Sequence, residues 1–558
     1  MKYQPKAAIP KDASAVILLN QDFTQVLWAQ RNPELKFLGG WHAFPGGKLE
    51  TSDAEINVEN CADAELAKFI ACAVRETFEE VGVLLVRGGE KLTKGQFVSL
   101  HDDLISGRFS LAEILVSWGL RIDAEDFFYT GFWTTPQFSP VRFKTRFFLA
   151  VCPPKQKPYA AITELRNVEF IAPKKALETW EKSEVLISPP VLISLKELFA
   201  TENTEKDREN LTSDKYGFTQ IGEDFNRDRQ DGQDKSKEIK NPVSAVCSYQ
   251  FSSSASLRLG GEKLLEKSQK FDGQIKYIEL NPRIVCFPLK TDTLPPATHT
   301  NCFIVGKKKF IVIDAASKDT NEQNFLHNLI NSFVEKGFVC KAIIVTHLHQ
   351  DHFGGETVLK KHLLEKFGLR VPISAHKSTA ESLQGKIKID CFIEDNEVFE
   401  LQDEDGKTFE LKTLHTPGHA RGHLCFYDEA FGFLLSGDNV IGAGSVIIAP
   451  PEGNMIDYLN SLERMKNLPN LKFLCGSHGA AGSNAKDKIE SYIAHRLERE
   501  RKILEAIKNG AKSVCEIVEK VYADVSPELW TLAEKSVEAH LEKLKIEGKL
   551  DLKVWNKK

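Results

Sequence analysis

The chain has 558 residues, 42% of them hydrophobic and 27% charged, and its formal net charge is −5. This length predicts three or four domains, and the composition excludes a wholly disordered or collagen-like protein. The charge gives no global attraction to nucleic acid or anionic lipid. Eleven cysteines, none in a C-x-x-C pair, indicate neither a disulfide framework nor a thiolate zinc site. With no signal peptide and no apolar run near the roughly 20 residues that span a bilayer, we expect a cytoplasmic protein without a membrane partner.

The first part of the chain, residues 10–198, has the pattern of an α/β or α+β domain. Its expected elements are strands over 14–19, 26–29, 127–133 and 146–152 and helices over 62–81 and 173–181. Residues 199–275 are polar, charged and poor in aliphatic side chains. Such a segment cannot offset an ordering cost of roughly 1–2 kcal/mol per residue, so we expect a flexible linker.

Strand-like runs return in the second half and alternate with helical patterns, which predicts a layered α/β domain over residues 276–490. The expected strands lie over 284–287, 301–305, 310–314 and 342–346. Residues 491–558 are predicted to be helical, with helices over 489–509, 513–522 and 528–547. The final segment, 548–554, is a candidate wing hairpin.

The helix predicted over 62–81 carries a cluster of acidic side chains. Glu76, Glu79 and Glu80 follow Arg75 at helical spacings that place the three carboxylates on one face. Like charges at this spacing repel by roughly 0.2–0.5 kcal/mol per pair, and a divalent cation would reverse that penalty. Oxygen ligands on a rigid helix suit Mg²⁺ or Mn²⁺ rather than zinc. The triplet alone is more typical of a solvated acidic face than of a metal site.

The wider pattern Arg75-Glu76-x-x-Glu79-Glu80-x-Gly82, with the turn Phe44-Pro-Gly-Gly47 upstream, resembles the Nudix box. The resemblance implies that the glutamates hold metals and that the arginine orients one of them. The pattern departs from the usual box, since 27 residues separate Gly47 from Arg75 and no mid-box glutamate can be placed. An elongated box of this kind resembles the peroxisomal-type coenzyme A Nudix hydrolases. The resemblance implies a substrate linked through a nucleoside diphosphate, such as coenzyme A or an acyl-CoA.

A cluster of metal-ligand side chains follows the strand predicted over 342–346. The run His347-Leu-His349-Gln-Asp351-His352 holds four potential ligands, and His419, Asp438 and His478 stand beside glycines after later strand-like runs. A strand end followed by a loop can direct alternate side chains to one point, and imidazole nitrogen with carboxylate oxygen suits zinc. The pattern therefore predicts a metal centre.

The order of these residues and their flanking glycines resemble the metallo-β-lactamase fold. The resemblance implies two zinc ions, one held by His347, His349 and His419, the other by Asp351, His352 and His478, with Asp438 bridging them. Two divalent ions acidify a shared water from a pKa near 16 toward about 7, so hydroxide forms at neutral pH. The expected outcome is hydrolysis, with phosphodiester, thioester and lactam substrates all open.

Two further residues could support this chemistry. His423 is a candidate proton donor, substrate-oxyanion contact or support for a metal ligand. Asp314 lies where the fold usually shows Asp-x-Gly, and it could orient a ligand although the glycine is missing. We expect catalysis to involve Asp351 and His423 in the second half and Arg75, Glu79 and Glu80 in the first.

The segments 457–462 and 493–500 and the helical tail resemble β-lactamase-like protein 2, a family of metallo-β-lactamase-fold endoribonucleases with a winged-helix domain. The resemblance covers about residues 280–552 and makes single-stranded RNA a candidate partner. Residues 491–558 hold 14 lysines and arginines against 12 aspartates and glutamates, far from the basic stripe of a strong nucleic-acid binder. A wall of the active-site cleft or a homodimer contact is an equally good role for this tail.

The sequence therefore predicts a multidomain α/β protein. The expected folds are a Nudix mixed sheet with helices, a metallo-β-lactamase αββα sandwich and a helical winged-helix domain. The expected function is a bifunctional metal-dependent hydrolase, RNA endonuclease-like in its second half and a Nudix diphosphohydrolase in its first. Two alternatives stay open: a glyoxalase-II-like thioesterase in the second half, or a non-catalytic nucleotide-sensing Nudix half.

Overall fold

The computed structural model describes residues 8–35, 38–136, 139, 141–202, 276–295, 297–442 and 445–550. They belong to two compact units, one on each side of residue 275. Apart from residues 199–202, the linker predicted over 199–275 lies outside the described residues, as does the end of the predicted wing beyond Leu550. None of the described helices is both long and apolar enough to cross a bilayer.

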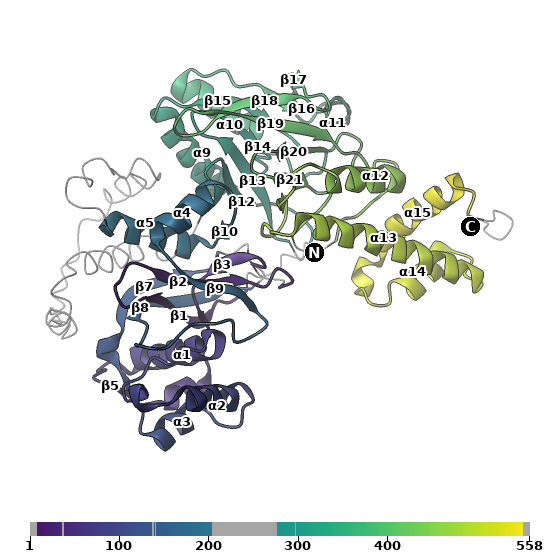
Figure 1. Ribbon diagram of the computed structural model, residues 1–558. Coiled ribbons are helices and arrows are strands. Elements are labelled where there is room, and N and C mark those ends of the chain that lie inside the picture. Colours follow the sequence, from purple (N-terminus) through teal and green to yellow (C-terminus); the bar gives the residue numbers. More distant parts are fainter. Residues whose placement is uncertain are drawn as a thin grey trace, which may run out of the picture. The chain divides into compact units, whose positions relative to one another are not determined.

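The N-terminal unit is built on a mixed eight-stranded sheet with helices on both faces (Figure 1). The strand order is β10-β3-β2-β1-β8-β7, with β4 paired to β1 and β9 paired to β2. The strands of this unit, including the separate pair β5–β6, are β1 (Lys11–Leu19), β2 (Val26–Arg31), β3 (Trp41–Ala43), β4 (Gly46–Lys48), β5 (Val58–Glu59), β6 (Ile122–Asp123), β7 (Phe128–Thr134), β8 (Phe143–Val151), β9 (Leu165–Ile171) and β10 (Leu186–Ile187). The helices are α1 (Ala64–Val81), α2 (Lys94–Ile105), α3 (Leu111–Trp118), α4 (Pro173–Glu181) and α5 (Pro189–Glu202), with 3₁₀ turns η1 (Thr51–Glu55), η2 (Gly89–Lys91) and η3 (Ala124–Asp126).

The central strand β1 explains the two covered faces. Its alternate residues point to opposite sides, so Val16 and Leu18 pack with α1, α2 and α3 while Ile17 and Leu19 pack with α4 and α5. Asp63 caps the start of α1, and Gly82 ends it with a left-handed φ of 67°. The Gly-Gly segment predicted as a turn is partly strand, because β4 pairs antiparallel with β1.

The C-terminal unit is built on twelve strands in the order β11-β12-β13-β14-β18-β19-β20-β21-β22, with β15, β16 and β17 added beside β14. Its strands are β11 (Ile278–Asn281), β12 (Ile284–Lys290), β13 (His299–Gly306), β14 (Lys309–Ile313), β15 (Val339–Ile344), β16 (Ile373–Ala375), β17 (Cys391–Phe392), β18 (Val398–Gln402), β19 (Thr408–His415), β20 (Leu424–Asp428), β21 (Phe433–Gly437) and β22 (Phe473–Gly476). Its helices are α9 (Thr320–Glu335), α10 (Glu356–Phe367), α11 (Lys377–Ser382), α12 (Met455–Lys466), α13 (Ala485–Lys508), α14 (Val514–Val521) and α15 (Trp530–Ile546), with the 3₁₀ turn η5 (Pro527–Leu529).

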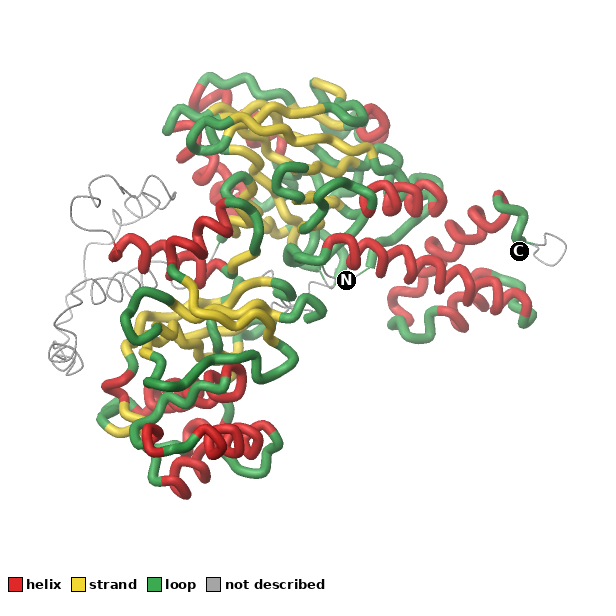
Figure 2. The backbone as a smooth tube through the Cα atoms, viewed as in Figure 1, coloured by secondary structure: helices red, strands yellow, loops and turns green. Residues whose placement is uncertain are grey.

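Two hydrophobic clusters give this unit its layers. Helices α9 and α10 pack against β12 to β15, and helices α12 and α13 pack against β19 to β22 (Figure 2). The result is the expected sandwich, in which strands such as β21 are buried along their whole length. The C-terminal helices form a further cluster of their own. The boundary predicted between residues 490 and 491 falls inside α13, so the sandwich and the tail share one helix.

Candidate metal centre

The seven side chains predicted to bind metal come from four loops, each of which follows a strand. The loop after β15 carries four of them, and the loops after β19, β21 and β22 carry one each. The carboxyl ends of parallel strands lie at one edge of a sheet, and β21 and β22 are parallel. Side chains separated by up to 131 positions in sequence therefore meet in space. They form two groups, and within each group all the ligand atoms lie within 4.8 Å of one another.

The first group joins three imidazoles and one carboxylate: His347, His349, His419 and Asp438. Nδ1 of His349 lies 2.9 Å from Nε2 of His347 and 2.9 Å from Nε2 of His419. Oδ2 of Asp438 lies 3.9 Å from Nε2 of His347 and 3.6 Å from Nε2 of His419. Three nitrogens and one oxygen thus surround a common point, a donor set typical of zinc.

The second group consists of Asp351, His352 and His478. Nε2 of His478 lies 3.4 Å from Oδ2 of Asp351 and 3.4 Å from Oδ1 of Asp438. Nε2 of His352 lies 3.4 Å from Oδ2 of Asp438. Asp438 therefore stands between the two groups and reaches both, as the resemblance implied.

The ligand imidazoles are held from behind by hydrogen bonds. Nδ1 of His352 lies 2.8 Å from Oδ2 of Asp314, which also accepts the hydroxyl of Thr346 at 2.8 Å. Nδ1 of His419 lies 2.8 Å from the carbonyl oxygen of Ile447, and Nδ1 of His478 lies 2.9 Å from that of His299. Such bonds fix the ring orientation and leave the other nitrogen to face a cation.

Sequence analysis singled out Asp314 in this supporting set but missed the carbonyls of Ile447 and His299. A backbone carbonyl has no signature in the sequence. The contact partners here lie 28 and 179 positions apart, so only the folded chain identifies them. Asp314 adopts a left-handed φ of 54°, a conformation that aspartate tolerates better than most residues other than glycine.

His423 is fully buried, and both of its ring nitrogens have protein partners. Nε2 accepts the backbone N–H of Asp438 at 3.0 Å, and Nδ1 lies 3.0 Å from the hydroxyl of Thr416. Gly437 makes this approach possible, because a Cβ there would overlap the ring of His423. Of the three roles considered for His423, the geometry favours support of a metal ligand, Asp438.

Burial sets the protonation of the first group. It lowers the pKa of His347 and of His349, and burial together with the neighbouring His349 lowers the pKa of His419 to about 3. These imidazoles are therefore neutral at physiological pH, which is the form that binds metal.

The second group is electrostatically different. Burial lowers the pKa of His352 and His478, but the surrounding carboxylates outweigh it, so the pKa of His352 lies well above its usual range and that of His478 rises to about 10. Burial raises the pKa of Asp438, yet His478 and His352 hold it well below its usual range. A cation bound here would offer the same positive charge to the carboxylates as the two imidazolium protons it displaces.

The donor set fits a pair of divalent cations. Among the described residues, thirteen buried side-chain polar atoms lack a hydrogen-bond partner, and Nε2 of His352 and Oδ1 of Asp438 are two of them. Buried polar atoms in native proteins normally have a partner, and a bound ion is one explanation for an exception. These two atoms belong to the ligand cluster, so metal binding would satisfy them.

The glutamates of the N-terminal unit are arranged differently. Nη1 of Arg75 lies 2.9 Å from Oε1 of Glu76 and 3.0 Å from Oε2 of Glu79. Oε2 of Glu80 instead accepts the backbone N–H of Gly46 at 2.8 Å. Within the described residues, these three carboxylates do not form a group of ligand atoms like the two above. Their oxygen-only chemistry still suits Mg²⁺ or Mn²⁺.

Burial makes these glutamates hard to ionise. It raises the pKa of Glu76 to about 7 against the opposing charge of Arg75, and it raises the pKa of Glu80 to about 8. Burial also raises the pKa of Glu79. A nearby divalent cation would favour the ionised forms and reverse these shifts.

Asp53 is a member of this site that sequence analysis missed. Its fully buried carboxylate pairs with Arg75 through Nε at 2.8 Å and Nη2 at 3.0 Å. Asp53 lies in η1, in the stretch between Gly47 and Arg75 that also contains β5 and the first part of α1. The search for a mid-box glutamate failed because the carboxylate that holds the arginine is an aspartate, six positions after Gly47.

Three models of known protein families match successive parts of the chain. Residues 10–110 match the family model described as the NUDIX domain, residues 295–478 match the metallo-beta-lactamase superfamily, and residues 513–551 match the beta-lactamase associated winged helix domain. The three expected folds are thereby confirmed.

Individual relatives are distant. The chain is 28% identical over 251 residues to the "Beta-lactamase-like protein 2 homolog" of Caenorhabditis elegans, covering 45% of this chain and 79% of that protein. It is 26% identical over 254 residues to the "Atrochrysone carboxyl ACP thioesterase nsrC" of Aspergillus novofumigatus, covering 45% of this chain and 71% of that protein. Among solved structures, a NUDIX hydrolase from Alicyclobacillus acidocaldarius is 28% identical and covers 36% of this chain and 96% of its own, with a TM-score of 0.31.

Proposed function

We propose that this chain, which joins a Nudix domain to a metallo-β-lactamase domain with a winged-helix tail, is a bifunctional hydrolase. Its C-terminal unit cleaves phosphodiester bonds of RNA, and its N-terminal unit cleaves a nucleoside-diphosphate-linked molecule such as coenzyme A. The convergence of seven ligand side chains from four loops carries the hydrolase assignment of the C-terminal unit.

The ligand geometry suggests which residues would hold two zinc ions. His347, His349 and His419 would hold one, Asp351, His352 and His478 would hold the other, and Asp438 would contact both. When bound, two such ions activate water and polarise the bond to be cleaved. The chain itself contributes orientation: Asp314 fixes His352, and His423 fixes the backbone of Asp438.

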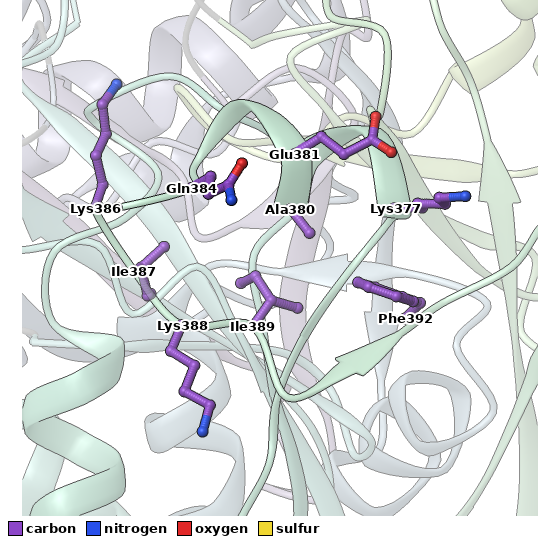
Figure 3. A pocket seen from close by; sticks show the side chains of 10 residues that line it. Lys377, Ala380, Glu381, Gln384, Lys386, Ile387, Lys388, Ile389 and Phe392 are labelled. Carbon is purple, nitrogen blue, oxygen red and sulfur yellow. The ribbon is translucent and has the colours of Figure 1, made fainter.

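A basic cavity in the same unit supports an anionic polymer as substrate. It has a volume of about 610 Å³ and its lining includes Lys377, Lys386 and Lys388 against one acidic side chain, Glu381. Figure 3 shows Ile387, Ile389 and Phe392 between these lysines. Lysines that neutralise phosphates and an exposed aromatic ring on which a base stacks are the usual elements of single-strand binding.

Two contacts connect this cavity to the loop that carries His419. The hydroxyl of Thr379, in α11, donates to the carbonyl of Gly422 at 2.9 Å. The ring of His376, which caps α11, stacks on that of His415 with centroids 4.0 Å apart. An RNA strand bound along the cavity would therefore lie against α11, the helix that contacts the loop of a proposed metal ligand.

A substrate panel tests the proposal. Zinc-loaded protein is offered a single-stranded RNA oligonucleotide, a generic phosphodiester and an acyl-CoA thioester. We expect RNA cleavage, and we expect His349→Ala with Asp351→Ala to abolish it while Mg²⁺-dependent hydrolysis of coenzyme A by the N-terminal unit persists. If none of the three substrates reacts, the hydrolase assignment of the C-terminal unit fails.

A second candidate function is a thioesterase, which the similarity to a protein named as an acyl-carrier thioesterase favours. The same donor set can polarise a thioester carbonyl. In the panel this function predicts thioester hydrolysis with RNA left intact, and the double variant would again abolish it.

For the N-terminal unit, we propose that Glu76, Glu79 and Glu80 bind Mg²⁺ or Mn²⁺ and that Arg75 positions two of them. Glu79→Gln with Glu80→Gln should then remove the Mg²⁺-dependent release of phosphoadenosine or nucleoside monophosphate, while RNA cleavage continues. Undiminished release would place the chemistry elsewhere. Binding of coenzyme A by wild-type protein without turnover would instead identify a nucleotide-sensing module.

A further inference from the structure

Helix α13 belongs to two hydrophobic clusters at once. Ala485 and Ile489, near its start, pack in the cluster of α12 and strands β19 to β22. Ile503 and Ile507, near its end, pack in the cluster of α14 and α15. An α-helix of 24 residues is a rigid rod of about 36 Å. The C-terminal helices and the metal-bearing sandwich are therefore joined through one continuous element.

Side chains in the middle of α13 form hydrogen bonds to the backbone of two residues that follow Asp438, Ile441 and Val446. The guanidinium of Arg496, which is only 3% exposed, donates from Nη2 to the carbonyl of Val446. The hydroxyl of Tyr492 donates to the carbonyl of Ile441 at 3.0 Å and accepts the N–H of the same residue at 3.3 Å. A buried guanidinium is costly to desolvate, and the bond to Val446 offsets part of that cost.

The residues next to these anchor points contact two of the proposed metal ligands. Ile447, adjacent to Val446, accepts the ring N–H of His419 at 2.8 Å. Gly442, adjacent to Ile441, donates its backbone N–H to the carbonyl of His478 at 2.7 Å. His419 belongs to the first ligand group and His478 to the second. One member of each ligand group therefore bonds to a residue whose chain neighbour bonds to a side chain of α13.

We propose that Arg496 and Tyr492 are positioning residues for the metal centre, so that the docking of α13 sets the metal affinity of the hydrolase site. This inference rests on the proposed function only in taking His419 and His478 as metal ligands. It gives the C-terminal helical region a role besides any contact with substrate: the region supports the metal centre from behind.

The chain offers a matched control on the same helix. Arg501 is exposed, and within the described part of the chain its ion pairs are with Glu498 and Glu505, both on α13. Arg496→Met and Arg501→Met therefore remove the same charge from one helix, but only the first removes a bond to the chain beside His419.

The test measures zinc affinity by competition with a chelator, together with the visible spectrum of the cobalt(II)-substituted full-length protein. Loss of a direct hydrogen-bond partner of a metal ligand typically costs 10–100-fold in affinity. Arg496 acts one residue further out, on Val446 beside the partner Ile447, so we expect a loss of about 10-fold or less for one ion in Arg496→Met. We expect the cobalt(II) spectrum to change as well, partial recovery in Arg496→Lys, and wild-type behaviour in Arg501→Met. A purely structural role would lower thermal stability and leave the cobalt(II) spectrum unchanged.

Tyr492→Phe keeps the test decisive if Arg496→Met does not fold. It removes a single hydroxyl from a half-buried ring, and we expect a several-fold loss of zinc affinity in the folded protein. Wild-type affinity and spectrum in every folded variant would overturn the inference while leaving the proposed function standing. A wild-type protein that binds neither zinc nor cobalt(II) would overturn the proposed function itself.

Discussion

The two candidate metal sites of this chain are prepared to different degrees. In the C-terminal unit seven ligand side chains already lie together, and carbonyls or carboxylates hold the imidazoles from behind. In the N-terminal unit Arg75 holds Glu76 and Glu79, and Glu80 bonds to the backbone of Gly46. The C-terminal site already has its ligand atoms facing one another. In the N-terminal site the carboxylates bond to Arg75 and to the backbone of Gly46 instead.

The difference follows from the charge of the ligands. Neutral imidazoles can approach one another at 2.9 Å without strong repulsion, and burial keeps those of His347, His349 and His419 neutral. Three carboxylates on one helix face repel one another, so an arginine takes the place of the missing positive charge. A histidine-rich site can therefore be built into the fold, while a carboxylate site depends more on its cation.

The largest expected effect tests whether Asp438 unites the two groups of the C-terminal site. Asp438→Asn keeps the shape of the side chain but removes the charge that faces both groups. Zinc retained after dialysis, measured by mass spectrometry, should fall to near zero, a larger loss than the 10–100-fold affinity change caused by losing a supporting bond. Glu79→Gln with Glu80→Gln is the matched comparison and should retain zinc at the wild-type level. Full zinc retention by Asp438→Asn would remove Asp438 from the ligand set.

The next effect tests the ion pairs of the N-terminal site. Arg75→Met leaves the fully buried carboxylate of Asp53 without its cation, and an uncompensated buried charge costs about 3–5 kcal/mol. At about 2–4 °C per kcal/mol for a unit of this size, calorimetry should show its unfolding transition about 6–20 °C lower. Arg121→Met breaks an exposed pair with Glu59, 58% and 41% exposed, so it should cost no more than about 1 kcal/mol. Equal shifts in the two variants would show that the buried Arg75 pair contributes no more to the stability of folding than the exposed Arg121 pair.

Sequence reasoning reaches furthest where chemistry and spacing coincide in a short segment. The run from His347 to His352 and the spacing of Glu76, Glu79 and Glu80 are local patterns, and the elements around them lie close to the predicted ranges. The Nudix and metallo-β-lactamase folds were likewise predictable, because their motifs carry the proposed ligand residues themselves.

What the sequence could not supply is non-local. No local pattern distinguishes the carbonyl of Ile447, which orients His419, from any other carbonyl. Asp53 was missed because its partner Arg75 lies 22 positions away and a glutamate was expected. The boundary predicted at 490 cut through α13, since amphipathic periodicity does not show that one helix serves two clusters.

The smallest expected effect sharpens the comparison at a single glycine. A Cβ at Gly47 would overlap the carboxylate of Glu76, so Gly47→Ala must displace this proposed ligand, at a cost of about 0.5–1.5 kcal/mol for the disturbed hydrogen bond to Arg75. Gly95→Ala, in helix α2, meets nothing within 4 Å and should stabilise by about 0.5–1 kcal/mol. Calorimetry should move the two variants in opposite directions, and only Gly47→Ala should weaken Mg²⁺ binding measured by titration. If Mg²⁺ binding in Gly47→Ala were unchanged, the position of the Glu76 carboxylate in the metal-free protein would not matter for binding. The N-terminal site would then form around its cation, rather than being arranged before the cation binds.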